Sequence, residues 1–259
     1  MHETTIRWFF VIQKDMIITS RANETIKAVK ALQQHKERER TGQHLIEGDK
    51  LVRDAALSGA DLVTVYATEG TEVPAFAPVV YVSEYVMESI SSQKTPQHLC
   101  AVVQTPDTGC PAVYPSGLII ALDRLQDPGN LGTILRTADA LGASGILLSE
   151  DSVDPFSPKA LRAAMGSTYH LPIWIGSLPE QLKKCKEQGF ICICGHLKGN
   201  SALPEHREKC VLVVGNEGNG VSDEVAEICI PYRLPMRGKA ESLNAAVFAA
   251  LLMQKMLEE

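Results

Sequence analysis

The sequence predicts an α/β protein made of two domains, and three observations support this. Beyond residue 117, short apolar segments alternate with helical patterns, as in a parallel sheet covered by helices on both faces. Residues 16–104 show a shorter mixture of helical and strand patterns. Residues 105–116, which lie between them, are rich in proline and predict a linker. We therefore expect one domain at 16–104, another at 117–259 and an N-terminal tail at 1–15.

The smaller domain is predicted to mix helices and strands. Asn23 can accept hydrogen bonds from the first turn of a helix, and apolar residues recur at helical spacing after it. This helix is expected to run to about Arg40. We expect strands at 44–47, 61–66 and 99–103, and helices at 23–40, 49–58 and 84–91.

The larger domain is predicted to be a sheet covered on both faces. Its strands are expected at 118–122, 145–148, 173–175, 190–194, 211–214 and 228–234, and its helices at 131–141, 158–165, 179–188 and 242–257. In open α/β sheets, ligands bind at the carboxyl ends of the strands. The loops that follow the strands are therefore the place to look for a site.

The composition excludes several classes of protein. The chain has 259 residues, 45% of them hydrophobic and 22% charged, which is typical of a globular protein rather than a disordered or fibrous one. A net charge of −6 argues against a protein that coats nucleic acid non-specifically. The seven cysteines are scattered through apolar runs, and the apolar segment near the start is too short to cross a bilayer. We expect a cytoplasmic protein without membrane contact.

The loop after the strand at 118–122 carries two candidate site residues. It begins at Asp123 and leads into a helix that holds Arg136. Asn130 can simply cap that helix, or it can belong to a site together with Arg136. The sequence leaves both interpretations open.

A glycine-rich turn at 215–220 follows the strand at 211–214. Its spacing, GxxGxG, is the reverse of the dinucleotide fingerprint, and the acidic residues after it would repel a pyrophosphate. The chain also lacks the GxxxxGK loop that cradles nucleotide phosphates. The glycines favour instead a close approach of the backbone to a flat, uncharged group such as adenine.

A third loop, 235–244, precedes the last helix. Ser242 can be the N-cap of this helix or a site residue. Because the helix is almost wholly apolar from 245 to 253, it must be buried in the core or at a subunit interface.

Three potential metal ligands, Cys192, Cys194 and His196, lie close together in the sequence. They alternate along one predicted strand, and no second cluster of ligands accompanies them. We therefore expect no metal site.

Taken together, the three loops resemble the signature motifs of the SpoU/TrmH family of RNA 2′-O-methyltransferases, within the SPOUT class. The first motif is NxGxxxR at 130–136, the second is GNEGxG at 215–220, and the third is PMxGxxxSLN at 235–244. Their order and their places after strands match as well, and the stretch at 159–167 is similar to a further family segment. The resemblance covers the second domain.

The resemblance has consequences for fold and partners. It implies a deep trefoil knot in the second domain and a homodimer, with the last helix and the helix of the first motif near the partner subunit. The first domain is similar, more loosely, to a substrate-binding domain with a fold like the ribosomal protein L30e. Such a domain would bind structured RNA by shape and phosphates. The candidate RNA-binding residues are Arg21, Lys27, Arg38 and Arg40, although such a basic stretch can also be a solvated helix face.

The family pattern also implies site residues in this chain. The candidate catalytic residues are Asn130, Arg136, Glu217, Ser242 and Asn244. The candidate residues for binding S-adenosylmethionine are Leu122, Gly215, Asn216, Gly218, Leu234, Met236 and Leu243.

The chemistry constrains these roles, because a ribose hydroxyl is poorly acidic and must be positioned and deprotonated. In the family the arginine that matches Arg136 is proposed as the general base, but a guanidinium is almost never deprotonated in proteins. We expect Arg136 to grip the adjacent phosphate and to favour the developing alkoxide. Either Glu217 or water would then take the proton. Asn130 and Asn244, with Ser242 beside them, would orient the ribose or the cofactor.

Ribosomal RNA, 23S in particular, is the favoured substrate. Two alternatives are the same chemistry on transfer RNA and a catalytically inactive RNA-binding relative. The presence of Asn130, Arg136 and Ser242 argues against an inactive relative.

Overall fold

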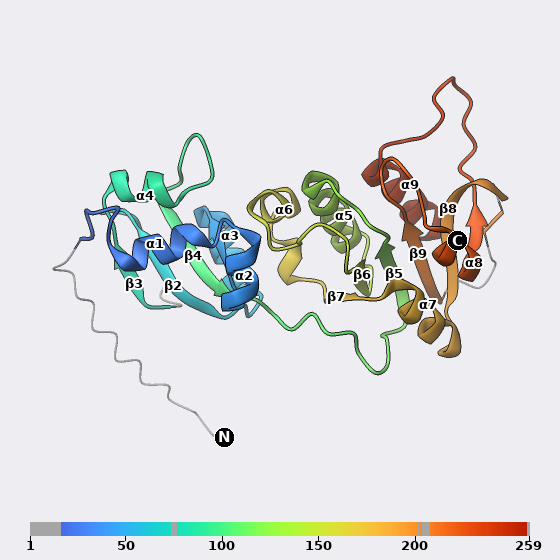
Figure 1. Cartoon of the computed structure of the whole chain (residues 1–259), viewed down its shortest axis with the longest axis horizontal. Helices are drawn as coiled ribbons and strands as arrows, with labels where there is room; N and C mark the ends of the chain where they lie inside the picture. The colour runs from blue at the N-terminus through green and yellow to red at the C-terminus, as the bar shows by residue number, and fades with distance from the viewer. Residues whose placement is uncertain (1–16, 74–76, 201, 204–207, 258–259) are drawn as a thin grey trace. The chain divides into compact units, whose positions relative to one another are not determined.

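The computed structural model describes residues 17–73, 77–200, 202–203 and 208–257. The predicted tail at 1–15 lies outside these residues. The chain divides into two compact units between Thr105 and Pro106 (Figure 1). Each unit has its own sheet and its own hydrophobic core.

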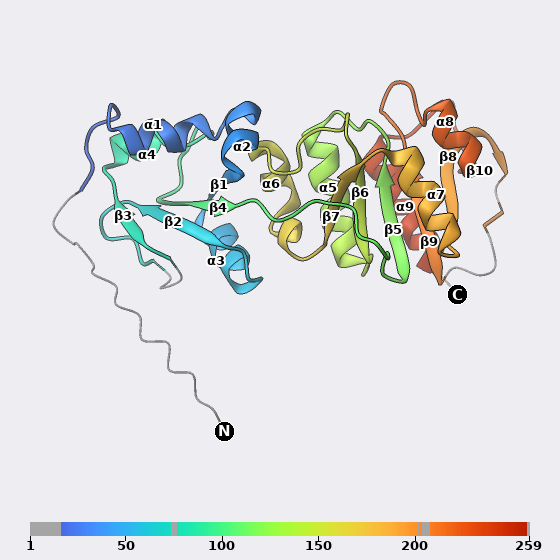
Figure 2. The ribbon, with the colours of Figure 1, turned by 60° about the horizontal axis from the view of Figure 1, so that its bottom comes forward.

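The first unit is a four-stranded mixed sheet with helices on both faces. Its elements are α1 (Glu24–Ala31), α2 (His35–Thr41), β1 (Gln43–Glu47), α3 (Asp49–Leu57), β2 (Leu62–Ala67), β3 (Val79–Tyr81), α4 (Glu84–Ile90) and β4 (Leu99–Gln104). The strand order is β1-β4-β2-β3, with β4 antiparallel to both of its neighbours and β3 parallel to β2. α1 and α4 pack together over one face, and α3 contacts β1 and β4 on the other (Figure 2). The sequence does not predict β3, because a strand of three residues is too short to show an alternation of apolar and polar side chains.

The predicted single helix at 23–40 is wrong, because the chain breaks between α1 and α2. Asn23 caps α1 as expected. The break is stabilised by Arg38, whose buried Nη1 donates to the carbonyl oxygens of Leu32 and Gln33 at 2.8 and 2.9 Å. These bonds satisfy backbone groups that a continuous helix would have paired.

The second unit is built on a six-stranded sheet in which every neighbouring pair is parallel, as predicted. Its strands are β5 (Gly117–Leu122), β6 (Gly145–Ser149), β7 (Ile173–Gly176), β8 (Ile191–Asn200), β9 (Lys209–Val214) and β10 (Ile230–Tyr232). Its helices are α5 (Pro128–Ala140), α6 (Pro158–Ala164), the 3-10 helix η1 (Ser167–Tyr169), α7 (Leu178–Glu187), α8 (Asp223–Ile228) and α9 (Ala245–Leu257).

The strand order β10-β8-β9-β5-β6-β7 places β5 beside β9 in the middle of the sheet. From β5 the chain moves outward to β6 and β7, whereas β8 and β10 lie on the far side of β9. Because β5 and β9 are parallel, the loops that follow them lie at the same edge of the sheet. This is a topological switch point, the usual position of a ligand site in such folds.

Helices cover both faces of this sheet, as predicted. Ile120 and Leu122 of β5 belong to the core beneath α5, α6 and α9, whereas Ile119 and Ala121 belong to the core beneath α7 and α8. All four side chains are fully buried. Burial on both faces explains why the strand is continuously apolar.

Some element boundaries differ from the prediction. α8 takes up residues 223–228, so the expected strand at 228–234 shrinks to β10. α9 begins at Ala245 and not at Ser242. Whether the chain forms a trefoil knot stays a prediction, because strand order does not trace the threading. No helix in the described part of the chain is both long and apolar enough to span a membrane.

The predicted linker at 105–116 is not free, because most of it packs against the second unit. The carbonyl of Thr108 accepts a hydrogen bond from the backbone N–H of Ile175 in β7 at 2.8 Å. The Tyr114 ring meets Trp174 edge-on, with 5.1 Å between the centroids. Tyr114 is 3% exposed, so this segment completes a core instead of joining two domains through solvent.

Gly132 lets α5 and α6 approach closely. A Cβ at this position would overlap the Cβ of Ala163 and would lie 2.5 Å from the carbonyl oxygen of Ala160. We predict that Gly132→Ala lowers the free energy of unfolding by about 1–3 kcal/mol, the usual cost of overpacking. Gly238→Ala is the matched control, because its Cβ would meet no atom of the described residues within 4 Å. Denaturant unfolding checks this, and equal stability of the two variants would contradict the close-packing account.

Candidate functional site

The loop after β5 is fixed by the N-cap of α5, which is Asp127. Its Oδ1 accepts from the backbone N of Asn130 at 2.9 Å, and its Oδ2 pairs with Lys159 Nζ at 3.0 Å. The pKa of Asp127 is held below its usual range mainly by the hydrogen bond from Lys159 and, to a smaller extent, by the bond from the backbone N of Asn130. Asn130 is therefore not the cap, and its side chain is available for other contacts. The signal missed in the sequence is the proline after Asp127, a residue favoured in the first helical turn.

The loop after β9 is a closed turn. Asn216 and Gly220 exchange two backbone hydrogen bonds, of 3.0 and 2.9 Å. The side chain of Asn216 accepts from the backbone N of Gly218 at 2.9 Å and donates to the carbonyl of Arg124 at 2.8 Å. A Cβ on Gly215 would overlap the backbone of Gly220. Gly215 thus permits a close approach between two parts of its own loop, and not only the approach to an adenine that the glycine pattern predicts.

The third loop ends at Asn244, which caps α9. Its Oδ1 accepts from the backbone N of Ala246 and Val247 at 2.9 and 3.3 Å. The capping role considered for Ser242 therefore belongs to Asn244. Ser242 is exposed and makes no hydrogen bond with any residue that the structure describes.

A chain of side-chain hydrogen bonds joins the three loops. Asn130 Nδ2 donates to Glu217 Oε1 at 3.0 Å, and Asn244 Nδ2 donates to Asn130 Oδ1 at 2.9 Å. Glu217 also accepts from the backbone N–H groups of Gln126 and Asp127, at 3.2 and 3.0 Å. The structure thus brings together three of the five candidate catalytic residues, from positions 87 and 114 residues apart.

The hydrogen bonds to Glu217 determine its acidity. Partial burial acts to raise the pKa of Glu217, but the hydrogen bonds from Asn130, Asp127 and Gln126 outweigh it and hold the pKa below its ordinary value. A carboxylate that is stabilised in its ionised form is a weak proton acceptor. Glu217 is therefore better suited to holding loops than to acting as a base.

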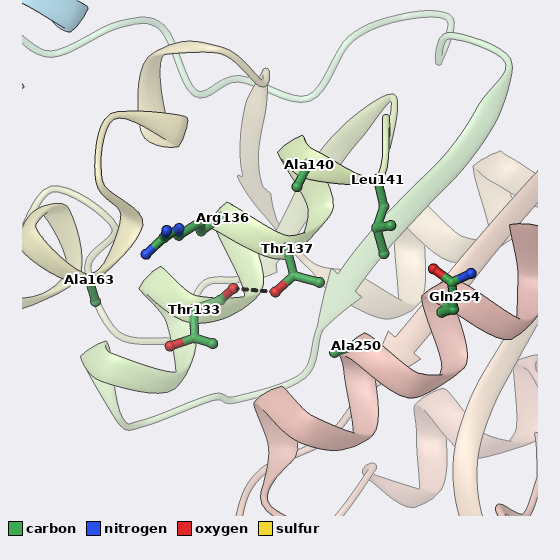
Figure 3. Close-up of a pocket in the computed structure, with 8 residues that line it drawn as sticks. All are labelled: Thr133, Arg136, Thr137, Ala140, Leu141, Ala163, Ala250 and Gln254. Atoms are coloured by element: carbon green, nitrogen blue, oxygen red, sulfur yellow. Dashed lines mark hydrogen bonds between the residues drawn. The ribbon is translucent and has the colours of Figure 1, made fainter.

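Arg136 lines a groove formed by residues of α5, α6 and α9 (Figure 3). The groove has a volume of about 540 Å³ and is lined by Thr133, Arg136, Thr137, Ala140, Leu141, Ala163, Ala250 and Gln254. The guanidinium extends from α5 toward Ala163 of α6 in this view. Arg136 is exposed and forms no ion pair with the described residues. A guanidinium in this situation suits an external anion.

The candidate cofactor residues fall into two groups. The side chain of Leu122 is fully buried in the core, so a direct contact of this side chain with a ligand is excluded. Leu234, Met236 and Leu243 are half-buried in a loop whose other residues are mostly exposed. Together with the backbone of the turn after β9, they offer apolar surface and hydrogen-bonding groups at one end of the sheet.

The basic candidates of the first unit are engaged within it. Arg38 is buried and binds two carbonyl groups, so its expected contact with RNA is wrong; it stabilises the break between α1 and α2 instead. Surface ion pairs join Arg21 to Glu88 at 3.1 Å, Lys27 to Glu24 at 2.7 Å and Arg40 to Glu37 at 2.9 Å. Exposed pairs of this kind are weak, so Lys27 and Arg40 remain available to a phosphate. Arg21 is held more firmly, because its Nε also donates to the carbonyl of Tyr85 at 2.7 Å and its guanidinium stacks on the Tyr85 ring.

The cysteines on β8 belong to the core. Cys192 and Cys194 are buried beneath α7 and α8. Within the described ranges, no three His, Cys, Asp or Glu side chains converge in a way that could hold a metal ion.

Comparisons with known proteins agree over nearly the whole chain. Residues 117–254 match the SpoU rRNA Methylase family, and residues 23–101 match the MRM3-like substrate binding domain. The chain is 34% identical to the 23S rRNA (guanosine(2553)-2′-O)-methyltransferase RlmP of Bacillus subtilis, over 91% of this chain and 96% of that protein.

Two solved structures are similar to the whole chain. The AdoMet-bound rRNA methyltransferase from Sinorhizobium meliloti is 32% identical with a TM-score of 0.84, over 93% of this chain and 97% of that one. A putative RNA methyltransferase of the TrmH family from Porphyromonas gingivalis is 34% identical with a TM-score of 0.80, over 91% and 97% of the two chains.

The hydrogen bonds to Glu217 predict a pH-dependent contribution to stability. Because its pKa is lower in the folded state, the ionised carboxylate stabilises the fold above the usual glutamate range, and this contribution is lost as pH falls through the folded-state pKa. We expect Glu217→Gln to melt below wild type at pH 7, and the difference to shrink below about pH 4. Calorimetry across pH checks this, with the exposed Glu227→Gln as control. A difference that stays constant with pH would contradict the prediction.

Proposed function

The chain belongs to the SpoU rRNA methylase family and is an S-adenosylmethionine-dependent RNA ribose 2′-O-methyltransferase, and we propose that it acts on 23S ribosomal RNA. The observation that carries the proposal is the hydrogen-bonded junction of the three motif loops, through Glu217, Asn130 and Asn244. The preference for 23S RNA is supported by the near full-length likeness to RlmP. We also propose a cytoplasmic location.

The residues present suit S-adenosylmethionine. Its adenine is flat and uncharged, which matches the half-buried Leu234, Met236 and Leu243 and the backbone groups of the turn that begins at Gly215. When bound, the molecule supplies a methyl group on a sulfonium, which an oxygen nucleophile can attack in line. Asn216 and Gly218 contribute to cofactor binding indirectly, because their hydrogen bonds keep the turn closed and so fix its shape.

The side chains of the site have different roles toward the substrate. Arg136, which is exposed and forms no ion pair within the described part of the chain, binds the phosphate beside the target ribose and favours the developing alkoxide. Asn130 and Asn244 hold the three loops in register and so orient the reacting groups. Because both carboxylate oxygens of Glu217 accept hydrogen bonds from the loops, we assign the proton transfer to water rather than to this side chain. Ser242, exposed in the third loop, assists in orienting the ribose.

The first unit serves substrate recognition. Residues 23–101 match a substrate-binding domain, and the unit presents Arg21, Lys27 and Arg40 at its surface. Their weak ion pairs can exchange for phosphates of a structured RNA.

The second unit forms a homodimer through α9 and α5. One face of α9 is buried in the core, but Val247 and Leu251 are each 48% exposed. They lie within one helical turn of Ala250 and Gln254, which line the groove shared with α5. An apolar face beside a groove suits a second copy of the same surface.

The substrate is tested in cells that lack the gene. We expect mapping of 2′-O-methyl groups to show the loss of one mark from 23S rRNA, restored by the wild-type gene. Arg136→Ala should fail to restore it while the protein keeps its fold and its affinity for S-adenosylmethionine. Loss of a mark from transfer RNA would replace the proposed substrate, and unchanged marks in both RNAs would contradict the proposal.

The dimer is tested by placing charge on the exposed face of α9. We expect Val247→Glu/Leu251→Glu to sediment as a monomer, because buried unpaired carboxylates oppose association. Leu57→Glu in the first unit is the control, since Leu57 is 77% exposed and lies outside this surface. Sedimentation of wild type as a monomer, or of the double variant as a dimer, would exclude this interface.

A further inference from the structure

Arg124 adopts a backbone conformation that side chains rarely take. It lies two residues beyond β5, with φ +56°, in the left-handed region that favours glycine. Its backbone is held from both sides, because its N donates to Ser149 Oγ at 2.8 Å and its carbonyl accepts from Asn216 Nδ2 at 2.8 Å. Glycine would meet these demands without strain, so the arginine at this position points to a use for its side chain.

The guanidinium of Arg124 has donors to spare. Its Nε lies 3.3 Å from Asp123 Oδ1 but is not aligned for a hydrogen bond, and this buried atom has no hydrogen-bond partner among the described residues. The outer nitrogens donate to none of the residues in the described ranges. The side chain is 38% exposed, so an anion from solution can reach it. Such a fork suits the paired oxygens of a phosphate.

Asp123 lies close to only one nitrogen of the Arg124 guanidinium, the Nε. The carboxylate is buried, and its Oδ2 accepts a hydrogen bond from the backbone N of Ser222 at 2.6 Å. Arg124 therefore compensates the buried carboxylate of Asp123 through Nε alone, and the two outer nitrogens of its guanidinium are left to bind another group. Its carbonyl is bound by Asn216, the residue before Glu217, so Arg124 belongs to the same set of joined loops as the site.

We propose that Arg124 binds a phosphate group of the substrate RNA beside the methylation site. The proposal rests on the function proposed above. The residues suited to the cofactor lie in the loops after β9 and β10, whereas Arg124 lies in the loop after β5, ahead of Asn130 and Arg136. Two guanidinium groups along this segment grip the RNA at two points and fix the target ribose between them.

The test is the salt dependence of RNA binding, because each phosphate contact contributes about 0.7–0.9 to the slope of log K against log salt. The probe is deproteinised ribosomal RNA from cells that lack the gene. We expect Arg124→Gly to bind it about tenfold more weakly, with a slope smaller by about that amount, and to bind S-adenosylmethionine like wild type. Lys183→Gln, an exposed cation on α7, is the matched control and should leave the slope unchanged.

A second variant separates RNA binding from a structural role. Asp123→Asn/Arg124→Gly removes the buried charge together with its partner, keeps an acceptor for Ser222 and suits the left-handed backbone. We expect it to melt no lower than wild type and yet to keep the full RNA defect. Recovery of wild-type RNA affinity and slope would show that Arg124 merely neutralises Asp123, and would overturn the proposal.

The remaining outcomes are also decisive. Weaker binding of S-adenosylmethionine with an unchanged RNA slope would assign the guanidinium to the cofactor carboxylate and overturn the proposal. If wild type methylates the RNA and Arg124→Gly keeps the wild-type slope, the proposed role of Arg124 is wrong, whereas the proposed function of the protein stands. If wild type neither binds nor methylates this RNA, the proposed function itself fails.

Discussion

The hydrogen bonds from Asn130 to Glu217 and from Asn244 to Asn130 connect the loops of the three motifs, and the bond from Asn244 attaches the third loop to the other two. Each loop leaves the sheet or enters a helix on its own, and loops at a sheet edge are the least constrained part of such a fold. The junction converts three separate loops into one surface. Its central member, Asn130, can serve both neighbours because an amide carries a donor and an acceptor. Neither an aspartate nor a leucine at this position could make both bonds.

A carboxylate saturated with hydrogen bonds recurs in the first unit. Glu47, at the end of β1, accepts from Ser91 Oγ at 2.6 Å, from the backbone N of Ser92 at 2.8 Å and from Gln93 Nε2 at 3.1 Å. These bonds fix the segment after α4, as those of Glu217 fix the loop after β5. In each unit an ionised glutamate, Glu47 or Glu217, holds a neighbouring loop in place. Hydrogen bonds to a charged acceptor suit this role, because they are stronger than those between neutral groups.

The distribution of cations fits a protein that is acidic overall and yet binds RNA. With a net charge of −6, attraction at long range contributes little, so recognition depends on individual side chains. In the first unit, Arg21, Lys27 and Arg40 form exposed ion pairs, and Arg38 is buried within the fold. In the second unit, Arg136 and the outer nitrogens of Arg124 form no hydrogen bonds with the residues that the structure describes. Under the roles proposed above, Arg136 and Arg124 add phosphate contacts in the second unit to those of the first unit.

The sequence by itself determined the parallel sheet, its two covered faces and the family. These follow from local features, since a strand buried on both faces must be apolar throughout and the motif residues keep a fixed spacing. It also gave the candidates Asn130, Glu217 and Asn244, which the structure joins. Their contacts could not be read from the chain, because the residues are 87 and 114 positions apart and spacing says nothing about distance across a sheet.

Tertiary structure alone decided what each polar group does. Arg38 and Arg136 are both arginines on helices, yet one is buried against carbonyl groups and the other is exposed in a groove. Burial of the Tyr114 ring against Trp174 makes the segment predicted as a linker part of a core. In each case the physical reason is the same: burial and hydrogen bonding depend on which distant segments pack together, and only the fold determines that.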